Sequence, residues 1–189
     1  MKRVGILGGT FDPPHIGHLI VANEVLDALN LDEIRFMPNH VPPHKQKTQQ
    51  VSNLDRLSML ENAISGHPGF FVEDIEIERE GTSFTLDTVK LLKHREPEVE
   101  FYFIIGADMI AYLPNWHGVD ELMTLISFVG VKRPGYEEST RYPITMVEMP
   151  ELHLSSSMIR KRIKAGQTTK YLLPDNVREY IKENGLYES

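Results

Sequence analysis

The sequence predicts an α/β fold in which an open, mainly parallel, Rossmann-like sheet is flanked by helices. Short apolar stretches alternate with helical patterns, which favours a parallel sheet. A glycine-rich corner joins the first apolar stretch to the first helical pattern, and ligands bind at such corners in open α/β sheets. No repeat, low-complexity tract or long linker divides the chain, so we expect residues 1–189 to form one domain.

The strands and the first helices are placed by their patterns. Six apolar stretches are strand candidates, at residues 4–7, 33–37, 71–77, 100–105, 127–131 and 144–149. The first helical pattern covers residues 15–29, with an apolar stripe of Leu19, Ala22, Leu26 and Leu29. Ser52 begins the second helix as its N-cap, because Asp55 three residues later completes a capping box.

Three further helices follow from their end signals. One begins near Thr85, which we expect to be its N-cap. Its inward side chains are expected to be Leu86, Val89 and either Leu91 or Leu92. Gly166 and Gly185 sit where helices that start at Ser156 and Pro174 should end.

Composition excludes several function classes. The net charge of −7 argues against nucleic-acid binding through a broad basic face, although it does not forbid a local basic pocket. The chain has no cysteine, which excludes disulfides and thiol catalysis. The N-terminus lacks the apolar core of a signal peptide, and no apolar run is as long as a membrane span. We therefore expect a cytoplasmic protein that binds neither nucleic acid nor membrane.

The most informative stretch is the corner at residues 8–18, which reads Gly-Gly-Thr-Phe-Asp-Pro-Pro-His-Ile-Gly-His. Gly8 and Gly9 lack a Cβ, so a phosphate or nucleotide can approach the backbone, and Thr10 adds a hydroxyl. His15 and His18 are three residues apart and share one face of a helical turn. Two imidazoles beside the N–H groups of a helix start suit a transition state that gathers negative charge.

Each part of this corner also has a purely structural explanation. A Gly-Gly pair is usually a turn, and two histidines at this spacing are often surface residues or half of a metal site. His40 and His44 could add ligands, but both lie in a proline-rich loop. Because structural zinc sites typically use four protein ligands and cysteine is absent, we expect no metal held by protein ligands.

The corner resembles the signature of the HxGH nucleotidyltransferase superfamily. A second motif of that superfamily, a Ser/Thr-rich helix start followed by Ile-Arg, matches residues 154–160, which read Leu-Ser-Ser-Ser-Met-Ile-Arg. Ser157 stands where the family often has Thr, and it keeps the hydroxyl. Two motifs at opposite ends of the chain make a chance match very improbable.

Within this superfamily the chain is similar to the bacterial nicotinate-mononucleotide adenylyltransferases over almost its full length. Three segments carry this likeness: Gly-Thr-Ser-Phe-Thr-Leu-Asp-Thr at 81–88, Ile-Gly-Ala-Asp at 105–108 and Leu-Pro-Asn-Trp at 113–116. The resemblance implies that a phosphate oxygen of nicotinate mononucleotide attacks the α-phosphorus of ATP and that pyrophosphate leaves. The product is nicotinate adenine dinucleotide, a step toward NAD. Mg²⁺ should accompany ATP, bound largely through phosphates and water.

The resemblance also implies roles for individual residues. It makes His15, His18 and Arg160 catalytic. It places ATP at Gly8, Gly9, Thr10, Phe11, His15, His18, Gly106, Asp108, Arg133, Ser156 and Arg160. It places nicotinate mononucleotide at Asn39, His40, Lys45, Thr85, Tyr112 and Trp116. The ring of Trp116 would stack on the pyridine, and the backbone N–H of Thr85 would receive the nicotinate carboxylate.

Three of these assignments have a simpler alternative. The run Ser155–Ser157 could serve only as an N-cap, and Trp116 could be an ordinary packing residue. The polar, basic, proline-rich segment at residues 38–47 is either a surface loop or a phosphate-binding loop at the carboxyl edge of the sheet.

Other functions compete with this one. A sibling enzyme, such as phosphopantetheine adenylyltransferase or a cytidylyltransferase, is disfavoured by the segment at 82–88 and by the Trp116 loop. A catalytically silent nucleotide-binding module would share the fold but is disfavoured by the intact motifs. No P-loop motif and no Gly-x-Gly-x-x-Gly after the first strand are present, which disfavours P-loop ATPases and Rossmann oxidoreductases. A homodimer is compatible with the sequence, which carries no heptad.

Overall fold

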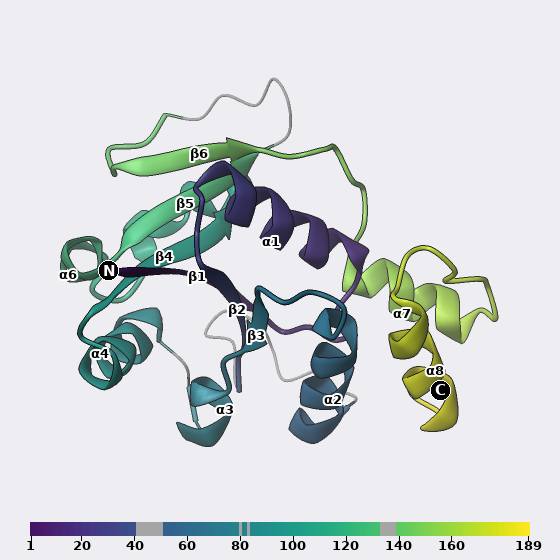
Figure 1. Ribbon diagram of the computed structural model, residues 1–189. Helices are drawn as coiled ribbons and strands as arrows, with labels where there is room; N and C mark the ends of the chain where they lie inside the picture. The colour runs from purple at the N-terminus through teal and green to yellow at the C-terminus, as the bar shows by residue number, and fades with distance from the viewer. Residues whose placement is uncertain (41–50, 80, 83, 133–138) are drawn as a thin grey trace.

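The sheet is parallel and doubly wound. The computed structural model describes residues 1–40, 51–79, 81–82, 84–132 and 139–189, and its strand order is β3-β2-β1-β4-β5-β6 (Figure 1). The strands are β1 (Lys2–Gly9), β2 (Glu33–Pro38), β3 (Phe70–Val72), β4 (Val99–Gly106), β5 (Ser127–Lys132) and β6 (Ile144–Glu148). The chain winds outward from β1 to β3, then returns to β4 on the other side of β1, so a switch point lies between β1 and β4. The predicted fold class is confirmed.

Two apolar cores cover the two faces of the sheet. One contains buried residues of α1 (Ile16–Ala28), α2 (Asn53–Ile64), α7 (Ser156–Lys164) and α8 (Asp175–Glu183). The other contains residues of α4 (Thr85–Arg95), α5 (Ala107–Ile110) and α6 (Val119–Leu125). Successive residues of β4 alternate between them: Phe103 packs in the second core and Ile104 in the first, as the two-residue period of a strand requires.

Most predicted helix ends are confirmed. The Ser52 hydroxyl accepts a hydrogen bond from the Asp55 N–H at 3.0 Å, and the capping box is complete. Gly166 and Gly185 have φ of +65° and +59° just after their helices, the left-handed geometry that suits glycine. The N-cap of α4 is Phe84, so the prediction of Thr85 as N-cap is wrong by one residue. Leu92 faces the core, whereas Leu91 is exposed.

The strand predicted at residues 71–77 is wrong beyond Val72, because Ile75–Arg79 forms the short helix α3. Ile75 and Ile77 alternate as in a strand, but the Asp74 carbonyl accepts the N–H groups of Ile77 and Glu78 at 2.8 and 3.0 Å and turns the chain. Sequence patterns also missed α5, α6 and the 3₁₀ turn η1 (Leu113–Asn115), which are short.

A buried ion-pair network lies on β2. Arg35 donates to Glu33 at 2.7 Å and to both carboxylate oxygens of Glu96 at 2.5 and 2.8 Å. The Glu73 carboxylate also pairs with Arg35 and with Arg95. This network packs the end of α4 against the sheet, and none of its residues lines the cavity described below.

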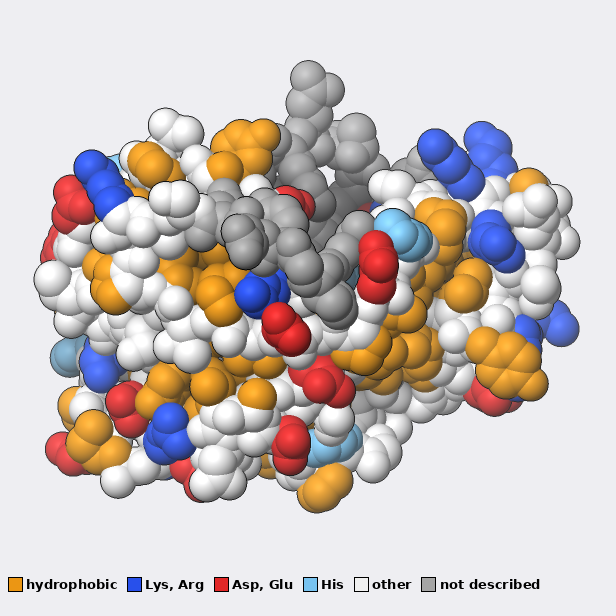
Figure 2. Space-filling view, turned by 90° about the horizontal axis from the view of Figure 1, so that it is seen from above, with side chains coloured by type: hydrophobic (Ala, Val, Ile, Leu, Met, Phe, Trp, Pro, Cys, Tyr) orange, Lys and Arg blue, Asp and Glu red, His pale blue; other side chains and the backbone are white. Residues whose placement is uncertain are grey.

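Positive charge gathers at one end of the molecule despite the net charge of −7. Figure 2 shows Lys and Arg side chains at the right-hand end, which α7 and α8 form in Figure 1. The last turn of α7 contributes Lys161, Arg162 and Lys164. No helix among the described residues is long and apolar enough to cross a membrane.

Candidate active site

A cavity of about 550 Å³ opens at the carboxyl ends of β1, β2 and β4, at the switch point. The start of α4 and the η1 turn close its other side. Its lining contains Gly8, Gly9, Thr10, Asn39, Thr85, Gly106 and Trp116, all predicted site residues from five different segments. Residues assigned to ATP and residues assigned to the mononucleotide therefore line one cavity.

The two histidines of the first motif stack on each other, and neither is among the residues that line this cavity. Their ring centroids are 3.7 Å apart, with 24° between the planes. The backbone N–H of His15, the N-cap of α1, donates to Nδ1 of His18 at 3.0 Å. Because Nδ1 of His18 accepts this bond, the proton of the neutral ring must sit on Nε2. His18 thus presents an N–H donor.

His15 is buried, with 6% of its surface exposed. Burial lowers the pKa of His15 to about 4, so the ring is neutral near neutral pH. Its Nδ1 is a buried polar atom without a hydrogen-bond partner among the described residues. A neutral ring held this way is ready to hydrogen-bond an incoming group.

This burial makes a prediction about stability. In the unfolded chain, His15 takes up a proton as the pH falls below its ordinary pKa of about 6.5. In the folded chain, the ring stays neutral until the pH falls to about 4. The free energy of unfolding should therefore fall as pH drops through this window, by at most about 3 kcal/mol from this group. We expect His15→Asn to lose less stability than the wild type between pH of about 7 and about 4.5 in urea unfolding. Equal losses would contradict the buried neutral histidine.

Gly17 is the residue that allows the stacked pair. A Cβ on Gly17 would lie 2.9 Å from both Cε1 and Nδ1 of His15, closer than carbon atoms pack. A glycine is therefore required at position 17 by the close approach of the His15 ring. Backbone conformation does not require it, because the φ of Gly17 is not positive.

The second motif docks onto the first. The Ser156 hydroxyl donates to the Pro13 carbonyl at 2.8 Å, and the Arg160 guanidinium donates to the Asp12 carbonyl at 2.8 Å. Ser155 is the N-cap of α7 and accepts from the Met158 N–H at 3.2 Å. Capping thus falls to Ser155, and Ser156 and Arg160 hold the loop that carries His15.

The same loop is fastened from two further directions. The Tyr187 hydroxyl donates to the Asp12 carboxylate, and both side chains are buried. Burial, and the negative charge of Asp12, raise the pKa of Tyr187. Arg56 of α2 donates to the Thr10 carbonyl at 2.8 Å and to the Asn39 carbonyl at 2.7 Å.

Three of the four buried side-chain polar atoms that lack a hydrogen-bond partner among the described residues lie at this site. They are Oγ1 of Thr10, Oδ1 of Asn39 and Nδ1 of His15. Buried polar atoms are nearly always paired in folded proteins, so such a cluster marks a place where a ligand completes the pairing.

The start of α4 offers donors to an anion. Its N-cap, Phe84, has no side-chain oxygen to accept the free N–H groups of the first turn. Thr85 is the first helical residue and lines the cavity together with Trp116. The Trp116 ring packs edge-on against Phe103 and Phe128, which fixes its orientation.

Some predicted residues do not fit the role assigned to them. The Phe11 side chain is fully buried, so only its backbone could contact ATP. Tyr112 is 61% exposed and does not line the cavity. His40 is also outside the lining, and its Nδ1 pairs with the Asn53 amide at 2.9 Å.

Three predictions remain to be placed. Asp108 is exposed and folds back over Gly106, since a Cβ on Gly106 would lie 2.6 Å from its Oδ1. Arg133 and Lys45 lie outside the residues that the structure describes.

Sequence reasoning missed several cavity residues, among them Glu76, Asn115 and His117. It also missed Arg56, although a signal was present. Arg56 occupies the apolar stripe of α2 with Met59, Leu60 and Ala63, and an arginine in such a stripe needs buried partners.

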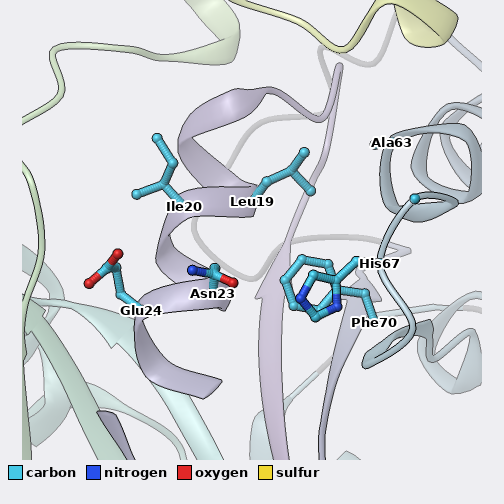
Figure 3. Close-up of a pocket in the computed structure, with 8 residues that line it drawn as sticks. Leu19, Ile20, Asn23, Glu24, Ala63, His67 and Phe70 are labelled. Carbon is cyan, nitrogen blue, oxygen red and sulfur yellow. The ribbon is translucent and has the colours of Figure 1, made fainter. Parts of the chain in front are cut away.

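A second hollow of about 370 Å³ lies between α1 and the end of α2 (Figure 3). Leu19, Asn23 and the stacked pair His67 and Phe70 line it. It contains no predicted site residue. Among the described residues there is also no group of three or more His, Asp or Glu side chains that could hold a metal ion.

Comparison with known proteins identifies the family. The chain matches the cytidylyltransferase-like family over residues 6–162. It is 56% identical over 189 residues to a nicotinate-nucleotide adenylyltransferase of Bacillus subtilis, and the match covers 100% of both chains. The chain belongs to the nicotinate-nucleotide adenylyltransferases of this family. A probable nicotinate-nucleotide adenylyltransferase of Geobacillus thermodenitrificans is 60% identical over 99% of this chain and 87% of that protein.

Solved structures of nicotinate-nucleotide adenylyltransferases share the fold. The Plasmodium falciparum nicotinic acid mononucleotide adenylyltransferase complexed with NaAD has a TM-score of 0.83 at 23% identity, covering 100% of this chain and 98% of that one. The same protein complexed with APC has a TM-score of 0.82 at 22% identity, with the same coverage. These structures confirm the fold, and the 56% identical relative together with the family match confirms the family resemblance inferred from the motifs.

Proposed function

We propose that this protein transfers the adenylyl group of ATP to nicotinate mononucleotide, forming nicotinate adenine dinucleotide and pyrophosphate for NAD biosynthesis. The observation that carries the proposal is the docking of the second motif onto the loop of the first, beside a cavity at the switch point. Close relatives that bear the adenylyltransferase name over their full length support it.

The chemistry needs few groups. The attacking phosphate oxygen is already an anion, so no general base is required, and catalysis consists of positioning two substrates and stabilising charge. The Nε2–H of His18, the α1 N-terminus and the Arg160 guanidinium are the donors for the phosphate oxygens. His15, neutral and stacked on His18, holds that ring in place.

ATP occupies the β1 side of the cavity in this proposal. The Gly8 and Gly9 backbone, Thr10 and Gly106 line this side of the cavity. Mg²⁺ would supply charge neutralisation on the phosphates when it is bound. The oxygens of Thr10 and Asn39 suit its hard, hydrated ion, because they can accept hydrogen bonds from metal-bound water.

Nicotinate mononucleotide occupies the α4 side. The uncapped N–H groups at Thr85 receive the carboxylate, since a helix start attracts an anion. Trp116 stacks on the pyridine ring. An amide gains less from a cluster of N–H donors than a carboxylate does, so nicotinate is preferred to nicotinamide.

The decisive experiment is pyrophosphate release by the purified protein with ATP and Mg²⁺. Nicotinate mononucleotide, nicotinamide mononucleotide and phosphopantetheine are offered in parallel. Strong release with nicotinate mononucleotide alone supports the reaction and the carboxylate site together. Release with phosphopantetheine instead would overturn the acceptor, and no release with any of them would favour a silent binding module.

The role of Trp116 has its own test. Loss of stacking on one aromatic ring costs about 1–3 kcal/mol, so Trp116→Ala should raise the KM for nicotinate mononucleotide about ten- to hundredfold and leave the KM for ATP nearly unchanged. Tyr171→Ala, which removes an exposed aromatic ring remote from the cavity, is the matched control. Weakened ATP binding with normal mononucleotide binding would remove Trp116 from the acceptor site.

A cytoplasmic location and a homodimer belong to the same proposal. The location follows from substrates that are made inside the cell, and fractionation tests it. Sedimentation of the purified chain at several concentrations distinguishes a dimer from a monomer.

A further inference from the structure

Arg56 is the largest fully buried side chain, with 0% exposure. One of its terminal nitrogens donates to the Thr10 carbonyl at 2.8 Å, and the other donates to the Asn39 carbonyl at 2.7 Å and to Oδ1 of Asn53 at 2.6 Å. Burying a guanidinium is expensive, and burial lowers the pKa of Arg56 while Asp12 nearby favours its charge. A leucine at this stripe position would pack without that cost.

The two carbonyls belong to neighbouring residues at one edge of the cavity, because β1 and β2 pair up to Gly9 and Pro38, the residues just before them. Thr10 follows the end of β1 and was assigned to ATP, and Asn39 follows the end of β2 and was assigned to the acceptor. Both residues present a buried, unpaired side-chain oxygen. The Arg56 guanidinium therefore holds the backbones of Thr10 and Asn39, the two residues whose buried side-chain oxygens are open to a ligand.

The planar shape of the guanidinium matters for this contact. Two fixed nitrogens can span two carbonyls at once, whereas a lysine ammonium is a single point on a flexible stem. The Asn39 N–H also donates to the Gly9 carbonyl at 3.0 Å, so the ends of β1 and β2 are joined by this bond as well as by the arginine. The distance between the Thr10 and Asn39 backbones is therefore fixed by hydrogen bonds and not only by apolar packing.

We propose that Arg56 is a positioning residue for the adenylyl transfer, which sets the spacing between Thr10, assigned to ATP, and Asn39, assigned to the acceptor. This inference rests on the proposed function. Arg56 touches neither substrate and acts through the backbones of Thr10 and Asn39, whose carbonyls its side chain holds. Misplacement of reacting groups by about 1 Å can cost about a hundredfold in rate, so loosening this contact should affect turnover more than affinity.

The test compares two buried arginines. Arg56→Lys should lower kcat at least about tenfold with smaller changes in both KM values. Arg35→Lys is the matched control, because Arg35 is also buried and hydrogen-bonded but lies in the ion-pair network away from the cavity. It should lower the Tm and leave kcat unchanged. Equal kcat for Arg56→Lys and wild type, or equal kcat losses in the two variants, would overturn the proposal.

Two further measurements separate positioning from folding. Arg56→Ala with millimolar guanidinium should regain part of its kcat, and methylammonium, which lacks the fork, should restore little. Asn53→Ala removes one acceptor of the guanidinium and should lower kcat in the same direction by less, which keeps the proposal testable if Arg56 variants do not fold. Equal restoration by both ions, together with wild-type kcat in Asn53→Ala, would refute the role.

The wild-type protein in the same assay isolates this inference from the proposed function. Absence of dinucleotide formation by the wild type would defeat the proposed function. If the wild type is active and Arg56→Lys keeps its full turnover, the positioning role of Arg56 is refuted and the proposed function stands.

Discussion

His18→Ala should lower kcat about a hundred- to a thousandfold and change the affinity for ATP only severalfold. The reason is that, in the proposed function, the Nε2–H of His18 donates where charge builds up during transfer, and loss of one such donor costs about this factor in enzymes that stabilise an oxyanion. Because the donor matters most in the transition state, kcat and kcat/KM should fall together.

Steady-state kinetics and direct ATP binding test this expectation. His67→Ala is the matched control, since His67 also stacks on an aromatic ring but lines the second hollow, away from the cavity. A higher KM with unchanged turnover in His18→Ala would show that the residue binds substrate without stabilising the transition state.

Gly17→Ala should lower kcat by about a hundredfold and also lower the Tm slightly. Alanine is the better helix former by about 1 kcal/mol, which favours the variant. The added Cβ, however, would lie 2.9 Å from the buried His15 ring and must displace it from its stack on His18. Overpacking of this kind costs about 1–3 kcal/mol, so the loss of activity should be much larger than the loss of stability.

Gly66→Ala provides the comparison, because a Cβ there has open space and Gly66 is outside the cavity. It should leave kcat at the wild-type value. If Gly17→Ala kept full activity, the close approach of the His15 ring would have no catalytic consequence.

Much of the site could be predicted from the sequence because its signals are local. Gly8 to His18 form one continuous stretch, and a strand followed by glycines and a helix start places them at the carboxyl edge of a sheet. The docking of Ser156 and Arg160 onto Pro13 and Asp12 is different, since these contacts join residues more than 140 positions apart. The family resemblance linked the two motifs, and no periodicity could have done so.

The errors also have physical causes. Ile75 and Ile77 alternate as in a strand, but the Asp74 carbonyl accepts the N–H groups of Ile77 and Glu78 and turns the chain into α3, a contact that alternation does not reveal. Tyr112 is aromatic and adjacent to η1, yet it points to solvent, because the 3₁₀ turn directs Leu113 inward instead. The place of Arg56 in the apolar stripe of α2 signalled its burial, but two of its partners are backbone carbonyls of distant residues, which carry no sequence signature.

The bond between Tyr187 and Asp12 spans 175 residues and has a consequence for synthesis. The loop that carries the histidines leaves the ribosome long before Tyr187, which fastens it. A nascent chain that has not yet exposed Tyr187 would have its sheet strands outside the ribosome and this loop still unfastened. We expect such tethered chains to bind mononucleotides poorly until Tyr187 has emerged and paired with Asp12.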